Sequence, residues 1–137
     1  MASKAALQQL FSAFKHLKTY DRVCQHVSIL SVGNGNIKAT MPVMEEHLNG
    51  MGTLHGGCTA SVFDTVSTFG LATAEDGKFG VSVDISISYI GAAKLGDTIT
   101  IESTALKKKG GIRFADVVIT NQDGTLIAKG THTKAMK

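Results

Sequence analysis

The stretch HGGCTASVFDTVSTFGLATA, residues 55–74, decides the fold of this 137-residue chain. Between Glu46 and Glu75 the sequence holds one acidic residue, Asp64, and no lysine or arginine. A helix whose circumference is apolar or small nearly all round belongs in the interior of a protein. The stretch therefore predicts one long helix that the rest of the chain encloses.

The segments on both sides of this stretch have the patterns of one further helix and of several strands. Leucines and phenylalanines recur at helical spacing over residues 4–18, which predicts an amphipathic N-terminal helix. The sequence Gly33-Asn34-Gly35 is a strong signal for a hairpin turn between the first two strands. Six segments are expected to be strands: 25–32, 36–43, 79–89, 97–106, 112–121 and 125–134.

The element order is therefore helix, two strands, long helix and four strands. An antiparallel sheet of about six strands, curled around the central helix, buries that helix most simply. We predict an α+β fold of this kind, with the N-terminal helix added, as a single domain over residues 1–137. In the segment 79–89, apolar residues alternate with polar ones, which predicts a half-buried strand with Ser82, Ser86 and Ser88 on one polar face.

Asp64 and the start of the central stretch together indicate a reactive site. An ionised carboxylate inside a protein is costly unless it is paired, hydrogen-bonded or used. The opening His55-Gly56-Gly57 leaves the first backbone N–H groups of the helix unshielded, and such groups bind a carbonyl oxygen or an anion. This combination suggests acyl transfer or hydrolysis. A structural alternative for Asp64 is a carboxylate satisfied by the neighbouring serines and threonines.

Composition limits the other classes of function. The formal net charge of +3 is too small to indicate nucleic acid binding, and no aromatic-basic motif is present. No run of about 18 apolar residues exists, so we expect no membrane span. Cys24 and Cys58 show no disulfide or ligand spacing, which fits reduced thiols inside a cell. The histidines show no metal-ligand spacing: His16, His26, His47 and His132.

The block Asn49-Gly-Met-Gly-Thr-Leu-His-Gly-Gly57, followed by Asp64, resembles the signature of the hotdog-fold thioesterases of the phenylacetic-acid-degradation type. Gly80–Asp84, Ala93–Gly96 and His132–Lys134 add to the resemblance, which covers nearly the whole chain. It implies a hotdog homotetramer that hydrolyses medium- to long-chain fatty acyl-CoA without a metal or redox cofactor. By position, it implies the catalytic residues Asn49, His55, Gly56, Asp64 and Ser82.

The residues allow roles in thioester hydrolysis to be assigned. The Gly56 N–H suits polarisation of the thioester carbonyl. Asp64 suits activation of water as a general base, which the resemblance favours, or nucleophilic attack through an anhydride. Ser82 would orient the water, unless it belongs to a solvated face with Ser86 and Ser88. His55 has the alternative of local hydrogen bonding at the helix start, and Asn49 that of shaping a glycine-rich turn.

Lysines in the turn before the fifth strand are candidates for holding the phosphates of CoA, because lysine binds phosphate as a point charge. A solvated hairpin tip is the structural alternative. The resemblance favours a CoA groove formed by this turn and by the segment after the third strand. The implied CoA residues are Tyr89, Ile90, Gly91, Ala92, Ala93, Lys94, Lys107, Lys108, Lys109, Gly110, Gly111 and Ile112.

Helix geometry adds a prediction about assembly. Gly56 and Asp64 are eight residues apart, so on one helix they are separated by about 12 Å along the axis and turned by about 80°. An aspartate side chain is too short to reach a water that attacks a carbonyl held at its own Gly56. We therefore expect the two groups to act together across subunits, which requires at least a dimer.

Three alternative functions remain open: hydrolysis of aryl-CoA, dehydration of a hydroxyacyl thioester, and acyl-CoA binding without catalysis. Dehydration is disfavoured because it would pair a histidine with the acid, whereas His55 lies far along the helix from Asp64. We expect a cytoplasmic protein. The N-terminus has three lysines and no acidic residue before Asp21, which leaves mitochondrial association as a second expectation.

Overall fold

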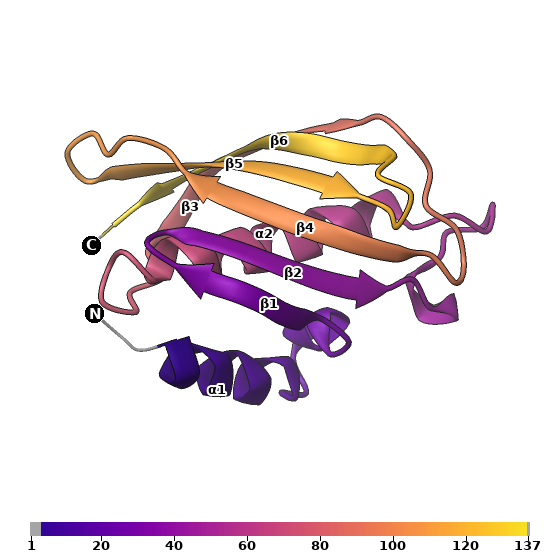
Figure 1. Ribbon diagram of the computed structural model, residues 1–137, viewed down its shortest axis with the longest axis horizontal. Helices are drawn as coiled ribbons and strands as arrows, with labels where there is room; N and C mark the ends of the chain where they lie inside the picture. The colour runs from indigo at the N-terminus through magenta and orange to yellow at the C-terminus, as the bar shows by residue number, and fades with distance from the viewer. Residues whose placement is uncertain (1–3, 137) are drawn as a thin grey trace.

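The computed structural model describes residues 4–136 and shows one six-stranded antiparallel sheet with two α-helices (Figure 1). The sheet has the order β1-β2-β4-β5-β6-β3. The helices are α1 (Lys4–Lys15) and α2 (Gly56–Ala72), with short 3₁₀ helices η1 (Tyr20–Cys24) and η2 (Glu45–His47). The strands are β1 (Ser28–Gly33), β2 (Asn36–Pro42), β3 (Val81–Tyr89), β4 (Thr98–Ala105), β5 (Ile112–Thr120) and β6 (Leu126–Ala135). The expected α+β architecture is confirmed.

The core lies between α2 and the inner face of the sheet. Apolar side chains of α2, including Val62, Phe63 and Val66, are fully buried. They meet alternate residues of the central strands, of which Ile99 and Ile101 on β4 are also fully buried. Each such side chain stabilises the fold by about 1.5–3 kcal/mol relative to its exposed state. Figure 1 shows α2 running behind the sheet and α1 beside the edge strand β1.

The expected burial of the central helix on every side is wrong for the single chain. Ser61, Asp64, Thr65 and Thr68 form a half-buried stripe along α2 at the spacing i, i+3, i+4 and i+7. The sheet covers only one side of the helix, and the stripe lies on the side that it leaves partly open. This side carries hydroxyl groups and the single carboxylate of α2 rather than large apolar side chains.

The expected alternation along β3 is also wrong, because a bulge interrupts it. In the register with β6, Ser82 lies opposite Lys134 but Ile85 lies opposite His132, with the irregularity between Ser82 and Asp84. One extra residue in a strand reverses the side to which the following side chains point. Ser82 therefore faces α2, whereas Ser86 and Ser88 face away from it.

The burial of β3 differs from the expected half-buried strand as well. β3 is an edge strand that pairs only with β6, and Val81 and Val83 are 55% and 61% exposed. Elsewhere the differences concern element ends. The first strand begins at Ser28 rather than residue 25, because a turn follows η1 (Tyr20–Cys24), in which the Val27 N–H donates to the Cys24 carbonyl. In residues 4–136, no helix is long and apolar enough to cross a membrane.

Gly130 is the position where β6 leaves least room for a side chain. A Cβ at Gly130 would clash with the carbonyl oxygen of Ser86 on β3. We expect Gly130→Ala to lower the free energy of unfolding by about 2 kcal/mol or more, because the two strands must move apart. Urea denaturation measures this change. Gly50→Ala is the control, since nothing lies within 4 Å of a Cβ there; equal stability of the two variants would contradict the prediction.

Candidate active site

A cavity of about 240 Å³ lies beside the middle of α2. It brings together Asp64 and Ser82, two of the predicted catalytic residues. One wall is aromatic, because Phe69 packs against Phe79 with ring centroids 4.9 Å apart and against Phe14 at 5.4 Å. The cavity is lined by Phe14, Asp21, Asp64, Thr65, Thr68, Phe69, Phe79, Gly80, Ser82 and Lys134. A polar reactive group thus borders an apolar surface.

The carboxylate of Asp64 is directed to this cavity and is not saturated by the chain. Its side chain is 46% exposed. Its one hydrogen bond within the described residues is a long one, 3.4 Å from Thr68 Oγ1 to Asp64 Oδ1. An ionised carboxylate has about four acceptor positions. The structural alternative, a carboxylate satisfied by neighbouring hydroxyls, therefore finds little support in the geometry.

Ser82 is held by the buried side chain of His132, which was not among the predicted catalytic residues. Ser82 Oγ lies 2.7 Å from His132 Nε2, and His132 Nδ1 lies 2.7 Å from Ser67 Oγ. The Ser67 hydroxyl donates to the carbonyl of Phe63 at 2.7 Å, so its proton is in use. Nδ1 of His132 then carries the imidazole proton, and Nε2 accepts from Ser82. This arrangement leaves the lone pairs of Ser82 free.

The position of His132 also bears on dehydration, one of the alternative functions. Its Nε2 lies 3.8 Å from Asp64 Oδ1, so a histidine does stand beside the central acid, although His55 does not. The absence of a histidine beside Asp64, which disfavoured dehydration, is therefore wrong. However, burial lowers the pKa of His132 to about 4, although the nearby charge of Asp64 opposes this. Since both ring nitrogens are already hydrogen-bonded, His132 is suited to positioning Ser82 and poorly suited to proton transfer near pH 7.

The signal that would have revealed His132 is the alternation of β6. His132 and Lys134 are two residues apart on one strand and are both buried, at 0% and 3% exposure. Polar residues on the buried side of a strand are unusual enough to mark a site. Lys134 Nζ donates a hydrogen bond to Thr68 Oγ1 at 2.8 Å. Burial lowers the pKa of Lys134, and the negative charge of Asp64 acts in the opposite direction.

Gly56 lies at the first residue of α2, away from this cavity. The preceding His55 caps the helix: its Nδ1 accepts from the Gly57 N–H at 2.8 Å. The structure therefore shows the alternative arrangement for His55, local hydrogen bonding at the helix start. Tyr89 Oη donates to the Gly56 carbonyl at 3.1 Å, while the Gly56 N–H makes no hydrogen bond to any other described residue. The free donor therefore exists where the sequence analysis placed it.

The structure does not bring Gly56 and Asp64 together within one chain. Both belong to the continuous helix α2, and eight residues of helix separate them by about 12 Å along its axis. Asn49 belongs to the Gly56 end as well. Its Oδ1 accepts from the N–H groups of Met51 and Thr53, and its Nδ2 donates to Thr53 Oγ1. These bonds support the turn-shaping alternative for Asn49, and its catalytic role stays a prediction.

The two predicted CoA segments lie at opposite ends of the sheet. Tyr89, where the first segment begins, pairs with Ala128 of β6, whereas Ile112, where the second ends, pairs with Ala135. Seven residues of strand separate these levels by about 23 Å. The segments Tyr89–Lys94 and Lys107–Ile112 of one chain therefore do not form a single groove.

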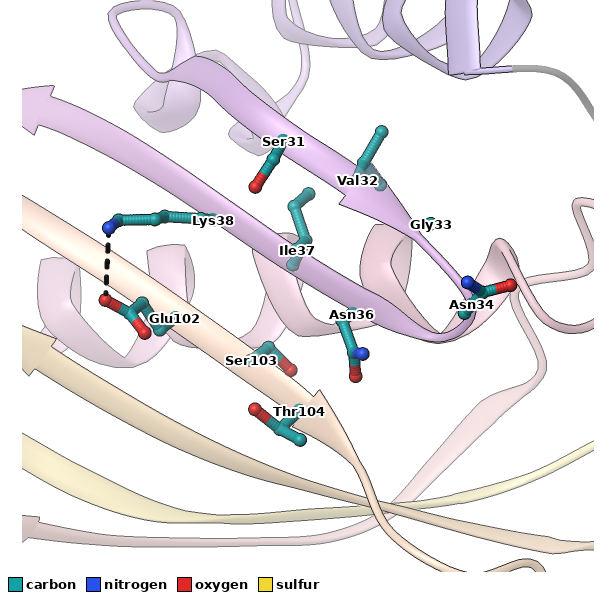
Figure 2. Close-up of a pocket in the computed structure, with 10 residues that line it drawn as sticks. All are labelled: Ser31, Val32, Gly33, Asn34, Asn36, Ile37, Lys38, Glu102, Ser103 and Thr104. Carbon is teal, nitrogen blue, oxygen red and sulfur yellow. Dashed lines mark ion pairs between the residues drawn. The ribbon is translucent and has the colours of Figure 1, made fainter.

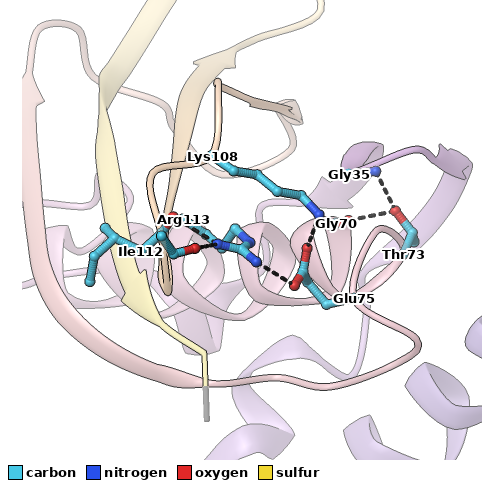
Figure 3. A network of polar contacts seen from close by, with 8 residues as sticks. Gly35, Gly70, Thr73, Glu75, Lys108, Ile112 and Arg113 are labelled. Atoms are coloured by element: carbon cyan, nitrogen blue, oxygen red, sulfur yellow. Dashed lines mark hydrogen bonds and ion pairs between the residues drawn. The ribbon is translucent and has the colours of Figure 1, made fainter.

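Lys108 is already paired in this structure. Its Nζ lies 2.9 Å from Glu75 Oε2, just beyond the end of α2, and Arg113 binds the other oxygen of Glu75 at 3.0 Å (Figure 3). The hydrogen bond from Arg113 is the main cause that holds the pKa of Glu75 below its usual range. Lys107 and Lys109 are exposed and appear in no ion pair among the described residues. They are the stronger candidates for contacting phosphate.

A larger hollow of about 420 Å³ lies over the hairpin of β1 and β2 and the adjacent end of β4 (Figure 2). Its charged residues are Lys38 and Glu102, which form an exposed ion pair at 3.6 Å. It contains none of the predicted site residues and is a weak candidate for chemistry. Among residues 4–136, no group of three or more His, Cys, Asp or Glu is placed to hold a metal ion.

Comparison with known proteins agrees with the fold. Residues 51–128 match the family model of the Thioesterase superfamily. The chain is 41% identical over 130 residues to acyl-coenzyme A thioesterase 13 of Homo sapiens, covering 94% of this chain and 93% of that protein. The crystal structure of zebrafish thioesterase superfamily member 2 is similar, with a TM-score of 0.95, 40% identity and full coverage of both chains.

A thioesterase protein of Streptococcus pneumoniae, solved with coenzyme A, is also similar. Its TM-score is 0.77 and its identity 31%, over 81% of this chain and 85% of that one. The family match covers more than half of the chain, and the TM-score of 0.95 shows that the zebrafish protein has the same fold. The chain therefore belongs to the thioesterase superfamily and is a thioester hydrolase with the hotdog fold.

Proposed function

We propose that this protein hydrolyses medium- to long-chain fatty acyl-CoA to free fatty acid and CoA, in sites shared between subunits. The observation that carries the proposal is the cavity in which the half-exposed carboxylate of Asp64 and the hydroxyl of Ser82 adjoin an aromatic wall. Similarity to acyl-coenzyme A thioesterase 13 supports acyl-CoA as the substrate class.

In the proposed reaction, Asp64 acts as general base. A water molecule hydrogen-bonded to Asp64 and Ser82 attacks the thioester carbonyl, and its proton passes to the carboxylate. The carbonyl oxygen gains negative charge and is stabilised by the Gly56 N–H of a neighbouring subunit, where the helix dipole acts in the same direction. The C–S bond then breaks, its electron pair leaves with sulfur, and the proton on Asp64 is available to the thiolate.

His132 keeps Ser82 ready for this step. Because the Ser82 hydroxyl donates its hydrogen bond to Nε2 of His132, the serine oxygen can only accept a hydrogen bond from the water. That orientation directs a water lone pair away from Ser82, toward the carbonyl. The phenylalanines of the cavity offer an apolar surface to the acyl chain.

The CoA moiety is proposed to bind between the segment Tyr89–Lys94 of one subunit and the turn Lys107–Ile112 of another. The separation of these segments within one chain supports this division. The solved pneumococcal relative with coenzyme A supports the ligand class. Binding energy from the nucleotide would position the thioester at the cavity.

Self-association is proposed to occur through the open side of α2 and the edge strand β3. Val81 and Val83 are exposed there, and an unpaired strand edge is a ready surface for pairing with another chain. A two-fold arrangement would create two equivalent sites, each with the Gly56 of one subunit and the Asp64 of the other. The homotetramer implied by the family resemblance would combine two such dimers.

Asp64→Asn tests the chemistry. We expect release of free thiol from palmitoyl-CoA to fall by about 100-fold or more, because the base is lost while the side-chain shape is kept. Binding of a non-hydrolysable acyl-CoA analogue should change little. Asp21→Asn is the matched control, since it alters the other carboxylate of the same cavity, and it should retain most of the activity.

The same assay separates the alternatives. Turnover by Asp64→Asn close to that of wild type would contradict the proposal. Conversion of a 3-hydroxyacyl-CoA to an enoyl-CoA without thiol release would indicate a dehydratase, for which the proximity of His132 and Asp64 is the favouring observation. Binding without turnover by wild type would indicate an acyl-CoA-binding protein. A preference for phenylacetyl-CoA over palmitoyl-CoA would indicate an aryl-CoA thioesterase.

Replacing Lys107 and Lys109 together by alanine tests the CoA contact. We expect KM for palmitoyl-CoA to rise several-fold with kcat within about twofold, since the loss affects binding in the ground and transition states alike. Steady-state kinetics at low ionic strength measure both constants. Lys38→Ala, on the outer face of the sheet, should leave KM unchanged; an unchanged KM in the double variant would contradict the assignment.

Val83→Lys tests the shared site. We expect wild type to be a dimer or larger by analytical ultracentrifugation. The variant should dissociate and lose at least about 99% of its turnover, because a charge would be buried at the strand edge and a monomer lacks a complete site. Leu30→Lys, on the opposite edge strand, is the control. A monomer with full activity would contradict the prediction.

A further inference from the structure

We propose that Lys134 is a positioning residue for hydrolysis: its buried ammonium group holds the hydroxyl of Thr68 so that this hydroxyl donates to the Asp64 carboxylate. The inference rests on the proposed role of Asp64 as general base. It assigns a function to two residues, one on β6 and one on α2, that the sequence analysis did not consider for catalysis.

The geometry forms a continuous chain from the cation to the carboxylate. Lys134 lies opposite Ser82 in the register of β6 and β3, at one wall of the cavity. Its Nζ is 2.8 Å from Thr68 Oγ1. Thr68 follows Asp64 by one helical turn, and its Oγ1 is 3.4 Å from Asp64 Oδ1. The three side chains therefore connect two elements that are far apart in the sequence.

The direction of this chain follows from the donors available. An ammonium group can only donate, so Thr68 must accept from Lys134. The single hydroxyl proton of Thr68 is then free for Asp64, which as a carboxylate can only accept. Oδ1 of Asp64 is thereby occupied. Oδ2 makes no hydrogen bond or ion pair with another described residue, which leaves it to receive the proton of the attacking water.

Packing alone gives no reason for a cation at this position. Lys134 is 3% exposed, and within residues 4–136 it makes no ion pair shorter than 4.0 Å. Only one of its three N–H donors has a partner in the described chain. A buried charge without a paired counter-ion is destabilising, and an apolar side chain of similar volume would pack there at less cost. The positive charge of Lys134 is explained by its link to the Asp64 carboxylate, which runs through the Thr68 hydroxyl.

The charged and titratable groups around Asp64 and His132 come from three elements besides α2 itself. Asp21 and Cys24 lie on η1, Asp84 on β3, and His132 and Lys134 on β6. Burial raises the pKa of Cys24 to about 11 and lowers that of His132 to about 4. Near pH 7 the Cys24 thiol and the His132 imidazole are therefore both neutral. Lys134 is the cation in this set that balances the carboxylates, so its removal should impair the site most at low pH.

The test compares Lys134→Met, Lys134→Arg, Thr68→Val, Thr68→Ser and the double variant Thr68→Val/Lys134→Met as full-length proteins. The measurement is kcat/KM for palmitoyl-CoA from pH 5 to 8, together with the melting temperature. We expect Lys134→Met to lose about tenfold in kcat/KM at pH 7 and to shift the acid limb of the profile upward by about one pH unit. Lys134→Arg keeps the charge and should keep the acid limb of wild type.

Thr68 provides the second arm of the experiment and serves alone if Lys134→Met does not fold. We expect Thr68→Val to lose kcat/KM, Thr68→Ser to retain it, and the double variant to be no worse than Lys134→Met, because both changes break one chain. A Lys134→Met profile that superimposes on wild type, or a Thr68→Val variant with wild-type kcat/KM, would overturn the inference. So would a lower melting temperature without any change in the pH profile.

If the proposed role of Asp64 in hydrolysis is itself wrong, the assay gives a different set of results. Wild type and Asp64→Asn are measured in the same assay. If wild type releases no thiol, or if Asp64→Asn is as active as wild type, the role of Asp64 is wrong and the inference falls with it. If wild type is active and Asp64→Asn is not, the Lys134 and Thr68 variants decide the inference alone.

Discussion

The rise of an α-helix, about 1.5 Å per residue, is the constraint on which this site depends. The free amide of Gly56 and the carboxylate of Asp64 lie on one rigid rod, with eight residues between them. No side-chain rotation closes a gap of about 12 Å. β3 runs in the opposite direction along α2, so that Tyr89 meets Gly56 while Ser82 reaches the cavity of Asp64. In the proposed mechanism, the Gly56 end and the Asp64 end of α2 therefore belong to two different sites.

The polar side chains buried around Asp64 lower the stability of the fold, and this loss of stability indicates that they have a role in the site. His132 is fully buried and kept neutral, and Lys134 is buried as a cation with a single hydrogen bond. Groups of this kind lower the stability of a fold unless they are satisfied. Here each is aimed at one of the two side chains that contact the proposed water: His132 at Ser82, and Lys134, through Thr68, at Asp64. The polar network thus fixes the orientation of both.

Much of the architecture could be predicted because its signals are local. The lack of charge between Glu46 and Glu75, the hairpin glycines at Gly33 and Gly35, and the alternation of the later strands each depend on a few neighbouring residues. The bulge between Ser82 and Asp84 could not be predicted, since it is set by pairing with β6 and leaves no mark on the alternation. This single inserted residue separated Ser82 from the serines that had been grouped with it.

The site was predicted in part for the same reason. Asp64 stands out in a segment without other charges, but His132 lies 68 residues later and is brought to it only by the packing of β6 against α2. The partly exposed stripe on α2 was not predicted. A helix with apolar or small residues on all sides is expected to be buried, but its sequence does not say whether its own chain or another subunit covers each side. In the single chain the sheet covers one side only, and the stripe from Ser61 to Thr68 stays partly open.

Mixing two inactive variants tests the sharing of the site most directly. Gly56→Pro removes the N–H while suiting the first helical position, and His55 already has the extended backbone that precedes a proline, with φ −62° and ψ 131°. Gly56→Ala keeps the N–H and is the control. Co-refolding Gly56→Pro with Asp64→Asn should restore about a quarter of wild-type activity, since each mixed dimer regains one intact site. Activity no greater than that of the separate variants would contradict a site built from two subunits.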